Sequence, residues 1–146
     1  MEPESRTPRV FILEDDPLRI ARFCTAGIGL YITVATSAEQ AKMRWLPPYD
    51  IVLLDHDLGG RVMVNGEDPN TGSEFCRWLP VFPKSHVPSR IVIHSYNPEG
   101  ATNMKALLID RGVSADLHPI DPRLLQWLRE FPREMRDGAE AEAEVV

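Results

Sequence analysis

The stretch DIVLLD, residues 50–55, constrains the fold of this chain more than any other feature of its sequence. Its four central residues are all apolar, so a strand formed by them would have no polar face to turn toward water. Strands that are apolar on both faces are typical of parallel sheets with helices on both sides. The runs RVFIL, residues 9–13, and RIVIHS, residues 90–95, predict two more strands of this sheet.

Helical segments alternate with the strands along the chain. Three of them begin at residues that commonly cap helices, Asp16, Ser37 and Asp121, each followed by an apolar face. Strand and helix thus alternate five times, which predicts an α/β fold, a (βα)5 doubly wound parallel five-stranded sheet with right-handed crossovers. The other predicted helices cover residues 72–79 and 100–112, and the other predicted strands cover residues 30–35 and 115–120.

Length and composition indicate one domain. A chain of 146 residues, 43% of them hydrophobic, can bury a substantial core. We expect the domain to cover residues 9–134, between an N-terminal extension, residues 1–8, and a flexible acidic tail, residues 135–146. No apolar run approaches the ~20 residues of a membrane span, and the first residues do not resemble a secretory signal.

Cysteine usage and net charge bear on location and partners. Cys24 and Cys76 lack the spacing of a metal site and are expected to be reduced thiols, which favours a cytoplasmic location. The formal net charge of -6 argues against broad electrostatic binding of nucleic acid. Neither a membrane nor DNA is therefore an expected partner.

Ionisable and polar residues collect where the predicted strands end. Parallel strands place their carboxyl ends at one edge of the sheet, and ligands of such sheets bind there. Crowded carboxylates repel one another unless a cation offsets their charge, and their oxygens suit Mg²⁺, Mn²⁺ or Ca²⁺. Histidine titrates near neutral pH and can transfer protons. Each residue alone is more often structural, but the group favours a function: Glu14, Asp15, Asp16, Asp55, His56, Asp57, His94, Ser95, Asn97 and His118.

Several of these segments resemble the response-regulator receiver domain, up to about Phe131. FILEDDPLR resembles its first strand with an acidic pair, DIVLLD its phosphoacceptor strand, IVIHS its switch strand and LHPI its Lys-Pro segment. The resemblance implies a flavodoxin/receiver-like sheet with strand order 2-1-3-4-5. It also implies a Mg²⁺ or Mn²⁺ site at Glu14, Asp15 and Asp55, completed by the backbone carbonyl of Asp57.

Other residues depart from the receiver pattern. His118 stands where receivers have a lysine, and histidines also follow Asp55 and precede Ser95. The motifs LDHDL and HSYNPEG and the His-Pro end resemble the predicted cyclic-phosphate-processing receiver group. This resemblance implies action on cyclic phosphate ends, in association with RNA repair.

The leading interpretation is a metal-dependent phosphoesterase that acts on a cyclic nucleotide or a 2′,3′-cyclic phosphate end. A metal held by aspartates would activate water, and histidines would supply the acid and the base. The part of the long Gly59 to Thr71 loop around Asn65 to Thr71 would close over the ligand. Side chains alternate along a strand, so either His94 or Ser95 faces the site. The expected catalytic residues are Asp55, His56, His94 and His118, and the expected phosphate- or substrate-binding residues are Ser95, Asn97 and Asp57.

Two alternatives stay open. The chain could be a stand-alone receiver that a sensor kinase phosphorylates on Asp55, with a modified switch. It could also be a non-catalytic module that keeps the metal site to bind a small phosphorylated ligand. The missing lysine and the added histidines favour the enzyme over the switch.

Overall fold

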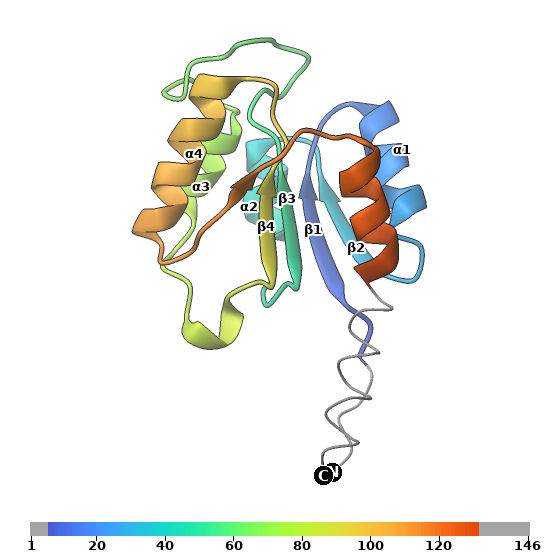
Figure 1. Cartoon of the computed structure of the whole chain (residues 1–146). Helices are drawn as coiled ribbons and strands as arrows, with labels where there is room; N and C mark the ends of the chain where they lie inside the picture. Colours follow the sequence, from blue (N-terminus) through green and yellow to red (C-terminus); the bar gives the residue numbers. More distant parts are fainter. Residues whose placement is uncertain (1–5, 132–146) are drawn as a thin grey trace.

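The computed structural model of the chain describes residues 6–131, and these form a five-stranded parallel sheet with helices on both faces (Figure 1). The strand order is β2-β1-β3-β4-β5, so the predicted fold and strand order are confirmed. The predicted tail, residues 135–146, lies outside the described residues, as does most of the predicted N-terminal extension. The strands are β1 Arg9–Leu13, β2 Tyr31–Ala35, β3 Ile51–Leu54, β4 Arg90–Ile93 and β5 Asp116–Leu117.

Local capping explains where the helices begin. Asp16 accepts a hydrogen bond from the backbone of Leu18, and Ser37 accepts one from Gln40, as their sequence positions predict. The fourth long helix begins at Pro98, two residues before its predicted start, because Asn97 caps it. The helices are α1 Pro17–Ala26, α2 Ala38–Arg44, α3 Gly72–Trp78, the short 3-10 helix Lys84–His86, α4 Pro98–Asp110 and a last helix over residues 122–131.

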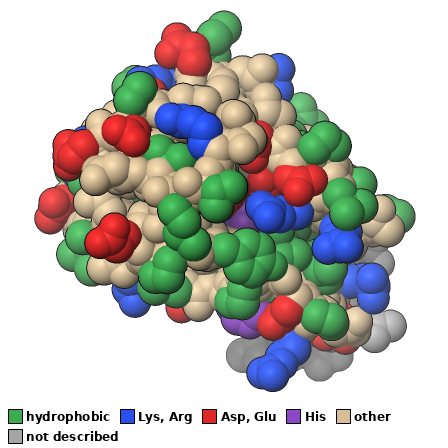
Figure 2. Space-filling model, turned by 90° about the horizontal axis from the view of Figure 1, so that it is seen from above, with side chains coloured by type: hydrophobic (Ala, Val, Ile, Leu, Met, Phe, Trp, Pro, Cys, Tyr) green, Lys and Arg blue, Asp and Glu red, His purple; other side chains and the backbone are tan. Residues whose placement is uncertain are grey.

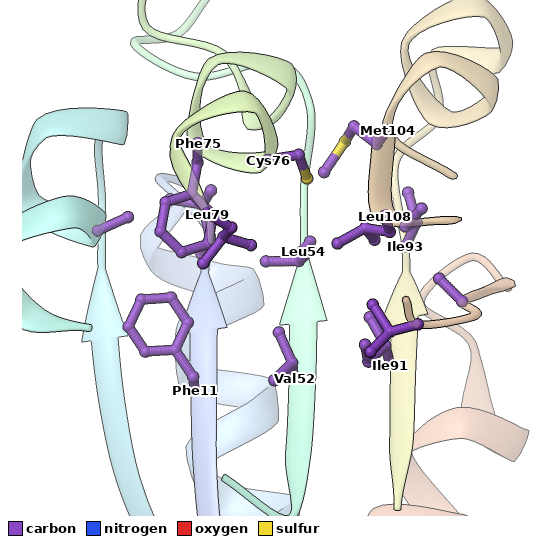
Figure 3. Close-up of a cluster of buried hydrophobic side chains, with 14 of the residues drawn as sticks. Phe11, Val52, Leu54, Phe75, Cys76, Leu79, Ile91, Ile93, Met104 and Leu108 are labelled. Atoms are coloured by element: carbon purple, nitrogen blue, oxygen red, sulfur yellow. The ribbon is translucent and has the colours of Figure 1, made fainter. Parts of the chain in front are cut away.

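Alternate residues of the central strands enter two separate cores. Phe11, Val52 and Ile91 pack against α2, α3 and α4, together with Leu54 and other residues shown in Figure 3. Residues one position away along the same strands, such as Ile12 and Leu53, pack against α1 and the last helix. Figure 1 shows the two helical layers on opposite sides of the sheet. This two-sided burial is what the unbroken apolar run of β3 predicts.

The amino edge of the sheet is held by a buried carboxylate. Asp50 is 6% exposed and accepts hydrogen bonds from the Arg6 guanidinium over 2.6 and 3.1 Å. It also accepts one from the backbone N–H of Arg9 over 2.7 Å. These contacts tie the chain before β1 to the start of β3. In the described residues, no helix is long and apolar enough to cross a membrane.

Candidate functional site

The carboxyl edge of the sheet carries a row of four polar residues, one from each of four strands. The backbone N–H groups of Glu14, Asp55, His94 and His118 each donate to the last residue of the neighbouring strand, over 2.9–3.0 Å. The ladder therefore continues one residue past the strands and aligns these four positions. Because side chains alternate, the first three residues of the row point to the α1 face, opposite to Leu54.

Glu14, Asp55 and His94 form a buried cluster in this row. Each offers one ligand atom, and these atoms lie within 4.8 Å of one another. Glu14 is fully buried and its Oε2 accepts the backbone N–H groups of Asp15 and Asp16 over 2.9 and 3.1 Å. Asp55 is 3% exposed and its Oδ1 accepts the backbone N–H of the next residue over 2.9 Å. Two carboxylates and one imidazole thus share a site that can hold a divalent cation.

Arg19 of α1 is the nearest cation to these carboxylates among the described residues. Its guanidinium lies 3.5 Å from Glu14 Oε1 and 3.8 Å from Asp55 Oδ2, which is longer than a charge-assisted hydrogen bond. It also stacks on the Tyr96 ring, 5.2 Å from the centroid. Arg19 compensates the acidic charge without saturating the carboxylate oxygens.

The cluster shifts the titration of its members. Burial, followed by repulsion from Glu14, raises the pKa of Asp55 to about 8. Burial also raises the pKa of Glu14, against the opposing effects of two backbone N–H groups and Arg19. Burial and then the charge of Arg19 lower the pKa of His94 to about 3, so its ring is neutral at physiological pH. A cation bound between these carboxylates would offset their mutual repulsion and favour their ionised forms.

A cavity of about 480 Å³ opens above the cluster. Figure 2 looks down on this edge and shows acidic and basic side chains beside a group of hydrophobic ones. Asp55 reaches the cavity from below, and Ser95 lines its wall, whereas His94 does not line it. This answers the question that the alternation of His94 and Ser95 left open. The other ionisable residues of the lining are Asp15, Asp16, Asp57, Arg19 and Arg61.

His56, which was expected to be an acid or base, is not among the residues that line the cavity. Its side chain is completely buried, Nδ1 lies 2.9 Å from Asp57 Oδ1, and Nε2 lies 3.0 Å from Ser73 Oγ. Ser73 is buried as well. Both ring nitrogens are therefore engaged with protein atoms away from the cavity. Through these two contacts, His56 fixes the end of β3 against the start of α3.

Asn97, which was expected to bind substrate, engages its side chain with protein atoms. Its side chain is buried and donates to Asp57 Oδ1 over 3.0 Å and to the carbonyl of Val64 over 2.8 Å. Its oxygen caps α4 by accepting the N–H of Gly100 over 3.0 Å. Asn97 therefore positions the loop before α3 and has no polar group left to offer a ligand.

The carboxylate of Asp57 lines the cavity but is largely occupied by the same loop. Oδ2 accepts the backbone N–H of Met63 over 2.7 Å, and Oδ1 accepts that of Val64 over 3.2 Å. Although burial opposes it, hydrogen bonds from Asn97, His56 and these two backbone groups lower the pKa of Asp57. Asp57 is thus a fixed anion that holds the loop beside the cavity.

The loop between β3 and α3 forms one wall of the cavity. Gly60 donates its backbone N–H to Asp15 over 2.8 Å, and Arg61 donates to the carbonyls of Leu58, Pro69 and Asn70. Arg61 therefore braces the loop internally. The part of the loop before the expected lid is hydrogen-bonded to Asp15 and to Asp57.

His118 belongs to the row but is separated from the cluster. Its ring is 28% exposed, and Nδ1 lies 2.8 Å from the carbonyl of Pro119. The expectation that His56, His94 and His118 share one cavity is not met, because none of them lines it. The rings of His56 and His94 are buried, and His118 follows β5, which lies two strands away from β3 and Asp55.

Sequence reasoning missed Arg19 and did not assign Tyr96 a role. Arg19 lies one helical turn after Asp16, a spacing at which side chains meet, and its guanidinium is 3.8 Å from that carboxylate. This spacing after the acidic pair was the available sign of a cation at the site. Tyr96 follows the switch position and is 56% exposed.

A doubly wound sheet of this order, with clustered acids at the ends of β1 and β3, defines the chain as a receiver-type domain. Residues 10–110, more than half of the chain, match the family "Cyclic-phosphate processing Receiver domain". The chain belongs to this family. No curated protein matches the chain.

Solved structures of receiver domains share the fold. The phosphorylated cyanobacterial phytochrome response regulator RcpA is 14% identical with a TM-score of 0.61, covering 89% of this chain and 96% of its own. A sensor protein from Polaromonas sp. JS666 is 27% identical with a TM-score of 0.56, covering 88% and 98%. The Mn²⁺-bound form of response regulator Rcp1 is 12% identical with a TM-score of 0.56, covering 85% and 93%.

Proposed function

We propose that the chain is a divalent-metal-dependent phosphoesterase that hydrolyses cyclic phosphates, either a cyclic nucleotide or a 2′,3′-cyclic phosphate end. The observation that carries the proposal is the cavity in which Asp15, Asp55 and Arg19 face one volume of about 480 Å³. Carboxylates suited to a metal and a guanidinium suited to phosphate oxygens are the two elements that such a reaction needs. Membership of the cyclic-phosphate processing family supports the same substrate class.

Glu14, Asp15 and Asp55 would hold the ion, Mg²⁺ or Mn²⁺ as first expected. The unpaired Glu14 Oε1 and the raised pKa of Asp55 fit a cation at this place. When bound, such an ion lowers the pKa of a coordinated water and neutralises charge on phosphate oxygens. Arg19 would orient the phosphate through its guanidinium, and Ser95 would bind it from the wall.

His118 is the remaining candidate for proton transfer, because its partly exposed ring can exchange protons with a ligand, unlike the buried His56 and His94. The assignment requires the ligand to extend from the cavity toward the end of β5. A small ligand end fits the acidic net charge of -6 better than a long RNA duplex does. The cytoplasm remains the proposed location, consistent with the unpaired Cys24 and Cys76.

The test is incubation of the metal-free protein with 2′,3′-cyclic nucleotides, with and without Mg²⁺ or Mn²⁺. We expect hydrolysis only with metal, and a loss of at least about 100-fold in kcat/KM in Asp55→Asn. Arg19→Gln should raise KM, whereas Arg22→Gln, on the same helix but exposed, should not. His118→Ala should flatten the pH profile of kcat.

A second function is favoured by the position of Asp55 at the cavity floor. There it can accept a phosphoryl group from a sensor kinase or a small donor, as in a signalling receiver. A beryllofluoride adduct or acetyl-phosphate modification of Asp55, without hydrolysis under any metal, would establish this function and reject the phosphoesterase. Phosphate binding without either reaction would leave a binding module.

A further inference from the structure

Three polar atoms at the carboxyl edge are buried and lack a hydrogen-bond partner among the described residues. They are Oε1 of Glu14 and both ring nitrogens of His94. His94 is 1% exposed, and its ring packs edge-on against Phe23 at a centroid distance of 5.0 Å. A histidine buried beside an aromatic ring with neither nitrogen satisfied is unfavourable for stability alone, because buried polar groups are normally paired.

The unpaired atoms face one another. His94 Nδ1 lies 3.7 Å from Glu14 Oε1, too far for a hydrogen bond, and a ligand oxygen of Asp55 is within 4.8 Å of both. Ligands of one ion at metal bond lengths of about 2.0–2.2 Å lie roughly 3–4 Å apart. Small side-chain adjustments would therefore bring all three donors onto a single cation.

Arg19 does not satisfy these atoms. Its guanidinium approaches the two carboxylates at 3.5 and 3.8 Å, and both ring nitrogens of His94 are left without a hydrogen-bond partner among the described residues. The row of strand ends explains why the three donors converge. Glu14, Asp55 and His94 occupy aligned positions on neighbouring strands, and their side chains point to the same face.

We propose that His94 is a ligand of the metal ion, through Nδ1 and together with Glu14 and Asp55, and that this nitrogen makes the site prefer Zn²⁺ to Mg²⁺. The inference rests on the metal site of the proposed function but changes its donor set. Imidazole suits zinc and similar transition metals, whereas Mg²⁺ prefers oxygen. The carboxylate of Asp15 accepts a hydrogen bond from the backbone N–H of Gly60 and keeps the loop in place.

The first test measures Zn²⁺ and Mg²⁺ affinities of the full chain by calorimetry, for the wild type and His94→Leu. We expect the variant to lose about 100-fold or more in Zn²⁺ affinity and little in Mg²⁺ affinity. His118→Ala is the matched control, since it removes a histidine from the same row but outside the cluster. It should leave Zn²⁺ affinity unchanged.

The metal-free stability of the same variant separates a ligand from a packing residue. His94→Leu removes two unpaired buried nitrogens, so its urea midpoint should equal or exceed that of the wild type. A lower midpoint together with unchanged Zn²⁺ affinity would show that His94 only packs, and would overturn the proposal.

Spectroscopy of the wild type tests the bond itself and needs no variant to fold. Pulsed electron paramagnetic resonance of the Mn²⁺-loaded protein should show coupling to a directly bound imidazole nitrogen. Its absence in a protein that binds Mn²⁺ would reject His94 as a ligand and leave the phosphoesterase intact. Nitrogen coupling in a protein that hydrolyses no cyclic phosphate would support His94 as a ligand and reject the phosphoesterase. A protein that binds no metal would reject both the ligand role of His94 and the phosphoesterase.

Discussion

At the scale of a single residue, the ionisation of Asp55 makes the free energy of unfolding depend on pH. Its pKa is raised from 3.8 to about 8 in the folded protein, so the folded state holds this proton more tightly than the unfolded state. Stability due to this group is complete below about pH 4 and falls as pH rises toward about 8. His94 acts in the opposite direction, because its pKa is lowered from 6.5 to about 3 and stability is lost as pH falls below 6.5.

The variant Asp55→Asn removes the pH dependence of stability that is due to Asp55 and keeps the one that is due to His94. In metal-free protein, we expect the variant to gain stability over the wild type as pH rises from about 5 to about 8, by at most about 1.4 kcal/mol per pH unit. Urea denaturation at several pH values measures the difference. Asp110→Asn, exposed on α4, is the control. A difference that stays constant with pH would contradict the raised pKa.

Position 100 requires a glycine because the His56 side chain packs against it. A Cβ atom at this position would overlap the imidazole of His56. Gly→Ala usually stabilises a helix by about 0.5–1 kcal/mol, but here we expect a loss of about 1–3 kcal/mol. Chemical denaturation checks the sign, with Glu99→Ala as a control on the same turn. In a His56→Ala background the loss should shrink, since the clashing ring is gone.

At the scale of elements, the loop between β3 and α3 depends on Asn97. Its oxygen caps α4, and its amide donates to Asp57 and to the carbonyl of Val64. Asn97→Asp keeps the cap but loses the amide donors, so it separates the two roles. We expect Asn97→Asp to speed hydrogen exchange at Met63 and Val64 while α4 stays protected. Asn97→Ala should expose both regions and cost about 1–3 kcal/mol. A loop that exchanges as slowly in both variants as in the wild type would contradict its anchoring by Asn97.

Local rules explain which elements could be predicted. Caps at Asp16, Ser37 and Asp121 involve neighbours in sequence, so the starts of these helices were correctly predicted. The direction in which a histidine side chain points depends on strand register. Contacts between residues that are distant in the sequence determine that register. His94 and Asp55 are aligned by pairing between β4 and β3, and only this alignment shows that both point to the α1 face. Of the predicted site residues, Asp15, Asp55 and Asp57 therefore line the cavity, whereas none of the predicted histidines does.

At the scale of the whole molecule, the two edges of the sheet have different tasks. The amino edge is closed by Asp50, whose partners Arg6 and Arg9 satisfy its carboxylate. The carboxyl edge concentrates partly unsatisfied acids. We expect Asp50→Ala to destabilise the domain by about 2–3 kcal/mol, because it leaves buried donors unpaired. Its metal affinity, measured on folded protein, should not change, whereas Asp55→Asn should lose metal binding. A parallel loss of metal affinity in Asp50→Ala would show that the edges are coupled.

The loop between β3 and α3 begins and ends at neighbouring positions, which has a consequence for engineering. The backbone N–H of Gly72 donates to the carbonyl of His56, and Asp57 pairs with Thr71 in a short bridge, so these contacts join the start of the loop to its end. The residues between these anchors leave and re-enter the domain at nearly the same point. New side chains at Val62 and Met63, which line the cavity, should therefore alter what enters it without moving Asp55. The domain offers an interchangeable segment beside a fixed cavity floor, which suits libraries selected for new phosphate ligands.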